Sequence, residues 1–116
     1  MASQTQRSGN NAANTIVVPA PRNANRRLEL TISITWSATP TSAPLLTVVN
    51  TDGETEIERY YSGATERAGA VGKAIKPETG ATITAAAPGN GIFTTLTVDW
   101  REIPAPARPR EEMDRI

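Results

Sequence analysis

A strict alternation of apolar and polar residues between positions 28 and 36 constrains the fold of this chain more than any other feature. Glu, Thr and Ser fill the intervening positions. The apolar positions are Leu28, Leu30, Ile32, Ile34 and Trp36. Side chains alternate across a β-strand, whereas a helix would scatter these residues around its circumference. The segment therefore predicts a long strand with one buried face and one solvated face.

Several other segments have the composition of short strands and are separated by turn signals such as Asn50 to Gly53 and Pro88 to Gly91. Besides the long strand, which extends to about residue 37, we predict strands at 14–18, 45–49, 54–61, 73–76, 81–87 and 92–103. The 45–49 and 54–61 segments are expected to form a hairpin. With no convincing helix, the chain is expected to be all-β, a single antiparallel β-sandwich. A jelly roll is the favoured topology and an immunoglobulin-like one the alternative.

The composition divides the chain into three parts. Residues 1–14 are polar and small, so we expect a flexible arm, because little apolar surface is present to offset chain entropy. Residues 15–103 form the predicted sandwich, with an irregular stretch at 62–72 that could include one helical turn at 64–68. Residues 104–116 begin with a proline-rich run and are expected to be an extended tail.

The absence of histidine and cysteine narrows the possible chemistry. It excludes Cys–His and Ser–His–Asp catalysis, disulfides and the common zinc sites. Twelve basic and twelve acidic residues give zero formal net charge, which argues against a strongly basic nucleic-acid binder. No apolar run is long enough to span a bilayer, and the first residues lack the apolar segment of a secretory signal. We therefore expect no catalytic residue, metal or cofactor, no specific nucleic acid, no membrane partner and no export.

Charged residues are distributed unevenly along the chain. The basic residues that precede the long strand are Arg7, Arg22, Arg26 and Arg27, and no acidic residue lies among them. Three carboxylates alternate along one face of a later predicted strand: Glu54, Glu56 and Glu58. They could be a solvated edge that discourages unwanted pairing, or a surface that binds the basic segment of a neighbouring copy. The segment lacks the Asp-x-Asp-x-Asp-Gly pattern of a calcium hand.

Three further sequence patterns resemble parts of functional sites. The Gly69 to Ala74 segment resembles a phosphate-binding loop only superficially, because Arg67 stands where that motif needs glycine. Four aromatic residues could serve core packing or a sugar-stacking platform: Trp36, Tyr60, Tyr61 and Trp100. Three carboxylates could in principle support glycoside hydrolysis: Asp52, Asp99 and Glu102. A small single sandwich leaves little room for a cleft, so we expect no enzymatic activity.

Several of the predicted strand segments and the turns between them, taken in order, resemble the corresponding segments of small β-sandwich virion proteins of tailed bacteriophages. The resemblance covers about residues 15–103. It is carried by Val17-Val-Pro-Ala20, the basic turn that follows, Arg27-Leu-Glu-Leu-Thr-Ile-Ser-Ile-Thr-Trp-Ser37, Leu45-Leu-Thr-Val-Val49 and Gly91-Ile-Phe-Thr-Thr-Leu-Thr-Val-Asp-Trp100. It implies a protein without catalytic residues, located in the virion after synthesis in the host cytoplasm.

The resemblance implies a capsid decoration or cement protein that binds the major capsid protein and stabilises the shell. It would act as a homo-oligomer, which we expect to be a trimer. A head–tail connector or tail component is an alternative within the same class. A carbohydrate-binding module that recognises a surface glycan through its aromatic residues is the alternative from a different class.

Overall fold

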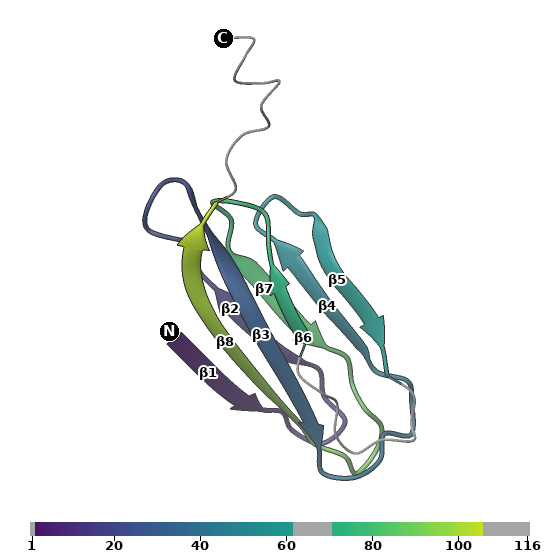
Figure 1. Cartoon of the computed structure of the whole chain (residues 1–116). Helices are drawn as coiled ribbons and strands as arrows, with labels where there is room; N and C mark the ends of the chain where they lie inside the picture. The colour runs from purple at the N-terminus through teal and green to yellow at the C-terminus, as the bar shows by residue number, and fades with distance from the viewer. Residues whose placement is uncertain (1, 62–70, 106–116) are drawn as a thin grey trace, which may run out of the picture.

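Eight β-strands and no helix make up the part of the chain that the computed structural model describes, residues 2–61 and 71–105 (Figure 1). The strands form two four-stranded antiparallel sheets. They are β1 (Ala2–Arg7), β2 (Asn14–Val18), β3 (Arg26–Trp36), β4 (Leu45–Asn50), β5 (Thr55–Tyr60), β6 (Val71–Ala74), β7 (Ala81–Ala85) and β8 (Thr94–Pro104). The predicted all-β, antiparallel sandwich is confirmed.

Sheet A has the strand order β1-β8-β3-β6 and is built around the two longest strands. β3 and β8 pair along their whole lengths, from Arg26 opposite Pro104 to Trp36 opposite Thr94. The alternating residues predicted to be buried in β3 are at most 3% exposed, and Leu96 and Val98 of β8 are fully buried. The alternation predicted for residues 28–36 is therefore confirmed.

Sheet B has the strand order β2-β7-β4-β5. β4 and β5 form the predicted hairpin, with Leu45 opposite Tyr60 and Val48 opposite Ile57. The register shifts between Val48 and Val49, so Glu56 is an extra residue that has no direct partner in β4. Such a β-bulge breaks the regular alternation of side chains.

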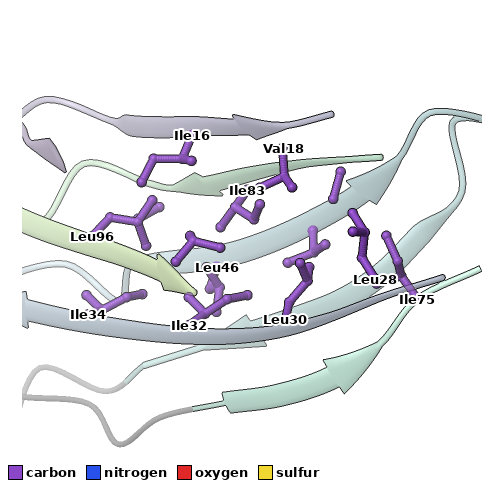
Figure 2. Close-up of a cluster of buried hydrophobic side chains, with 14 of the residues drawn as sticks. Ile16, Val18, Leu28, Leu30, Ile32, Ile34, Leu46, Ile75, Ile83 and Leu96 are labelled. Carbon is purple, nitrogen blue, oxygen red and sulfur yellow. The ribbon is translucent and has the colours of Figure 1, made fainter. Parts of the chain in front are cut away.

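The core lies between the inner faces of the two sheets (Figure 2). Leu30 and Ile32 of sheet A face Leu46 and Ile83 of sheet B, and all four are at most 1% exposed. Burial of each such side chain contributes about 1.5–3 kcal/mol of gross stabilisation. The predicted strand at 73–76 lies two residues earlier, at 71–74, and the residue that follows it, Ile75, joins the core.

The strand pairings are nested around the β4–β5 hairpin. The first strand pairs with the eighth, the second with the seventh, the third with the sixth and the fourth with the fifth. Pairs of β3 with β8 and of β4 with β7 complete the sheets. Consecutive strands therefore alternate between the two sheets, except at the β4–β5 hairpin.

The N-terminal segment differs from the prediction. Residues 2–7 were expected to belong to a flexible arm, yet they form β1, which pairs with β8 from Ala2 opposite Trp100 to Arg7 opposite Thr95. All six residues are exposed, so β1 adds main-chain hydrogen bonds at the sheet edge and almost no apolar burial. Composition could not reveal this strand, because its partner supplies the main-chain hydrogen bonds that hold it.

Two other predictions are only partly covered by the structure. Of the predicted tail, Pro104 ends β8 and the Ala105 N–H donates to the Asn25 carbonyl at 2.9 Å. The possible helical turn at 64–68 and residues 106–116 lie outside the described residues. The end of the rejected phosphate-loop segment, from Val71 to Ala74, is the edge strand β6.

Candidate functional site

The turn between β4 and β5 is organised by the side chain of Asn50, which is 4% exposed. Its Oδ1 accepts hydrogen bonds from the backbone N–H groups of Asp52 (2.9 Å) and Glu54 (3.1 Å). Gly53 supplies the positive φ of 84° that the turn requires. An asparagine that bonds to its own downstream backbone stabilises a tight turn, so Asn50 fixes the position of the acidic residues that follow it.

Lys76 forms ion pairs with two carboxylates of this turn. Its Nζ lies 2.8 Å from Asp52 Oδ2 and 2.8 Å from Glu54 Oε1. The hydrogen bond from Lys76, followed by that from Asn50, lowers the pKa of Glu54 below its ordinary value of 4.5. The same contacts to Asp52 and Glu54 raise the pKa of Lys76. Both groups are therefore held in their charged forms.

Glu56 is bonded within the same chain. Its Oε2 accepts from Asn50 Nδ2 and from the backbone N–H of Lys76, both at 2.8 Å, and its Oε1 lies 4.0 Å from Lys73 Nζ. These contacts join the edge of sheet B to the edge of sheet A, because Glu56 lies in β5 whereas Lys73 lies in β6. Glu54 and Glu56 thus have basic and amide partners in their own chain.

A hollow of about 340 Å³ opens beside this cluster at the β5 and β6 edges. It is lined by Arg27, Asn50, Glu54, Thr55, Glu56, Ala74, Ile75 and Lys76. Arg27 Nε is buried and has no hydrogen-bond partner among the described residues. The hollow combines positive and negative groups that largely neutralise each other, and it presents no free nucleophile or general base. No group of three metal-ligating side chains occurs in residues 2–61 and 71–105.

The four arginines predicted to bind a partner do not form one patch. The guanidinium of Arg7 lies 4.8 Å from the centre of the Phe93 ring, at the end of sheet A where β8 begins. Arg26 and Arg27 lie opposite Pro104 and Ile103, where β8 ends. Arg22 is in the preceding turn, and its N–H donates to Glu102 Oε2 at 3.3 Å. The structure brings only Arg27 to the hollow that Glu54 and Glu56 line.

The carboxylates considered for hydrolysis are also separated. Asp52 bonds to Lys76 in the β4–β5 turn, and Glu102 accepts from the turn at Arg22. Asp99 pairs with Thr31 in the middle of sheet A. Asp99 and Glu102 lie three residues apart on one strand and so project from opposite faces. The structure does not bring these three groups together.

The four aromatic residues do not assemble into one exposed platform. Trp36 is 3% exposed and packs edge-on against Tyr61, with ring centroids 5.5 Å apart. Burial raises the pKa of Tyr61. Trp100 is partly buried toward the other end of β8, where it lines an open hollow of about 480 Å³ with Ala2, Asn23, Arg101 and Glu102. Tyr60 is 66% exposed on β5. Core packing is therefore the role of Trp36.

The outer face of sheet B, called here the sheet B face, brings together residues that sequence reasoning did not connect. Strand register arranges them in three rows, with Ala13 and Ala86 extending the first row beyond the strand ends. The rows are Ala13–Ala86–Leu45–Tyr60, Thr15–Thr84–Thr47–Glu58 and Val17–Thr82–Val49–Thr55. The repeated Thr and Val at positions between core residues were visible in the sequence, but only the register unites them.

The sheet B face has little charge. Of these twelve described residues, Glu58 alone is charged. Val17 (64% exposed) and Tyr60 (66%) are the exposed large apolar side chains of the described chain, and they stand at opposite edges of this face. The outer face of sheet A, in contrast, carries Asp99 and the ion pair between Glu29 and Arg101. Depletion of charge with an exposed aromatic residue is typical of a protein interface.

Comparison with known proteins does not assign the chain to a family. No protein-family model matches the chain, and a search of curated proteins finds no match. No helix of a length and hydropathy that would cross a membrane occurs in the described part of the chain.

Proposed function

We propose that the protein is a structural subunit of a bacteriophage virion, a capsid decoration protein that binds the major capsid protein and stabilises the shell. The nested pairing of the eight strands carries the proposal. We assign this pairing to a jelly roll, in which a long hairpin is rolled so that first and last strands are neighbours. Jelly rolls recur in viral capsid proteins and in lectins. An immunoglobulin-like topology fits less well, because β1 and β2 lie in different sheets.

A jelly-roll fold alone does not distinguish a viral capsid protein from a lectin. The surfaces of the molecule provide further support for the proposal. The charge-poor sheet B face is rich in β-branched residues, which suits contact with another protein. The acidic cluster is bonded within the chain and holds two sheet edges together. Both features suit a non-enzymatic subunit that contacts copies of itself and other virion proteins.

A head–tail connector or tail component would use the same kind of surface and differs in its place in the particle. The test is mass spectrometry of virions purified on a density gradient from lysates of the strain that carries the gene. A decoration protein is expected at a copy number comparable to that of the major capsid protein, and a connector at far fewer copies. Absence of the chain from purified virions would contradict both roles. Where the chain is present, electron microscopy of virions with a label at residue 2 locates it on the capsid or at the head–tail junction.

Carbohydrate binding is the second candidate function, and the hollow beside Trp100 favours it. An aromatic ring next to polar side chains, here Asn23, Arg101 and Glu102, is the combination that binds a sugar by stacking and hydrogen bonding. Screening the purified protein on a glycan array tests this role. Binding that is lost in Trp100→Ala but kept in Tyr60→Ala would support it, and the absence of any glycan ligand would remove it.

A further inference from the structure

We propose that the sheet B face is a self-association surface, on which a second copy of this chain packs face to face across a two-fold axis parallel to the strands. The inference goes beyond the proposed function and does not depend on it, because it concerns the purified protein alone. Two properties of the face lead to a second copy as the partner, namely its charge and the placement of its large and small side chains. Its area sets how tightly the two copies bind.

The charge of the sheet B face suits a copy of itself. A partner with a strongly charged surface would find no complementary field there, since Glu58 is the one charged residue among the twelve described ones. A neutral Thr- and Val-rich face matches another neutral face, and its one charged residue, Glu58, lies on the edge strand β5 at the rim of the contact. Threonine and valine also have few rotamers, so little side-chain entropy is lost on contact.

Large and small side chains occupy opposite halves of the first row. Leu45 and Tyr60 lie on β4 and β5, whereas Ala86 and Ala13 lie on the side of β7 and β2. A two-fold axis parallel to the strands places β5 of one copy over β2 of the other and β4 over β7. Tyr60 then packs on Ala13 of the other copy, and Leu45 packs on Ala86. A protrusion meets a small residue at both positions, so the face is complementary to itself in volume.

The position of Glu58 selects this axis over the alternative. With the axis parallel to the strands, Glu58 lies over Thr15 of the other copy, because both belong to the second row. With the axis across the strands, Glu58 would lie over Glu58, and opposed like charges are unfavourable. A contact of this kind uses the same surface on both copies and closes at two. It therefore predicts a dimer in solution, in place of the trimer expected from the resemblance.

The area of the face predicts a weak, reversible dimer. Four strands about 4.8 Å apart and about five residues of 3.3 Å each cover roughly 300–400 Å². Stable interfaces bury about 800 Å² on each partner. The dimer should therefore dissociate on dilution, with a dissociation constant of roughly 10 μM to 1 mM. Such a contact would be strengthened where many copies are held side by side.

Sedimentation equilibrium of the full chain from about 10 μM to about 1 mM tests the inference. The average mass is expected to rise from 12.4 kDa toward twice that value. Thr84→Glu places a negative charge in the middle row of the face, beside Glu58 of the other copy, and should hold the mass at that of one chain. Thr97→Glu is the matched control, since Thr97 lies on central strand β8 and pairs with Ser33 on the outer face of sheet A. It should associate like the wild type.

Thermal unfolding of both variants shows whether they are folded. If Thr84→Glu does not fold, Tyr60→Ser replaces it, because a side chain that is 66% exposed can be removed with little loss of packing. Tyr60→Ser should weaken association by at least threefold. A wild type that stays at one chain up to 1 mM, a mass that levels at three chains, or association that neither face variant weakens would overturn the inference. None of these results bears on whether the chain is found in virions.

Discussion

At the scale of single residues, the charged cluster beside Asn50 shows how a surface that resembles a binding site can be structural. One buried amide fixes the turn through Asp52 and Glu54, and its Nδ2 donates to Glu56. Lys76 then holds the carboxylates in place. Of the three glutamates that the sequence predicted as a partner surface, Glu58 lies on the sheet B face, whereas the other two are bonded to their own chain.

The ion pairs of Lys76 predict a particular pH dependence of stability. Because the folded-state pKa of Glu54 lies below 4.5, its stabilising contribution is present above pH 4.5 and is lost as the pH falls through the folded-state value. Because the pKa of Lys76 is raised above 10.5, its contribution is present below pH 10.5 and is lost as the pH rises through the folded-state value. Lys76→Met should therefore lower the urea midpoint most at intermediate pH.

The measurement is urea unfolding of the wild type and Lys76→Met between pH 3 and pH 9. The gap between their midpoints should narrow toward pH 3. Lys73→Met is the control, because Lys73 lies 4.0 Å from Glu56 and leaves the contacts of Glu54 in place. It should keep the wild-type response to acid. A gap between the wild type and Lys76→Met that stays constant over this range would show that the pair with Glu54 is too screened to matter.

Two glycines should respond oppositely to alanine. A Cβ on Gly80 would lie 2.4 Å from the Val18 carbonyl oxygen and 2.8 Å from the Ala20 nitrogen, and neither backbone atom can move freely. Gly80→Ala should therefore cost about 1–3 kcal/mol of unfolding free energy. At Gly72, on the edge strand β6, the nearest atom is the Leu30 carbonyl oxygen at an ordinary 3.9 Å. Gly72→Ala should be neutral or stabilise by about 0.4–1 kcal/mol. Equal effects in urea unfolding would contradict this.

At the scale of elements, β1 is the strand with the weakest attachment by burial, since all six of its residues are exposed. The side chain of Asn14, which is 1% exposed, links the end of β1 to β8. Its Nδ2 donates to the Gln6 carbonyl (2.7 Å) and to the Thr94 carbonyl (3.1 Å). Thr5 and Thr97 add a contact of 3.1 Å between their hydroxyls. The strand is held by polar contacts that water can replace.

Hydrogen exchange should reveal this difference between strands. The amides of β1 that donate to β8 are expected to exchange faster than those joining β3 and β8, because local opening of an exposed edge costs less than global unfolding. Asn14→Ala should accelerate exchange in β1 further and lower the unfolding free energy by about 1–3 kcal/mol. Thr15→Ala, at the exposed neighbouring position, is the control and should change neither. Uniform protection across sheet A would mean that β1 unfolds only with the core.

The contrast between β3 and β1 explains what the sequence could predict. β3 could be predicted because apolar residues alternate with polar ones from Leu28 to Trp36. Hydrophobicity is a property of the residues themselves, and the apolar ones are the residues that are buried. β1 has no such pattern, because its partner β8 supplies its hydrogen bonds. The sheet B face was unpredictable for a related reason. Val17 and Tyr60 lie 43 positions apart in sequence, and only the pairing order places them on one surface.

At the scale of the whole molecule, nested pairing joins residues that are far apart in sequence. Ala2 lies opposite Trp100 and Arg26 lies opposite Pro104. Among the strand pairs of residues 2–61 and 71–105, only the β4–β5 hairpin is local. Closing long loops costs chain entropy before the contacts that stabilise the core can form. We therefore expect the local β4–β5 hairpin to form first and the more distant strand pairs to form later. We expect the pairing of β3 with β8 to be the step that commits the chain to folding.

Refolding from urea, followed by tryptophan fluorescence, should accordingly take milliseconds to seconds, as in other proteins dominated by non-local strand pairs. Val98→Ala in β8 should slow refolding, because its contacts with Ile32 form at the committing step. Asn14→Ala should chiefly accelerate unfolding, since β1 adds to an edge that already exists. If Asn14→Ala instead slowed refolding as much as Val98→Ala, β1 would belong to the folding nucleus. The N-terminal strand would then be needed to form the sandwich, rather than being attached to it afterwards.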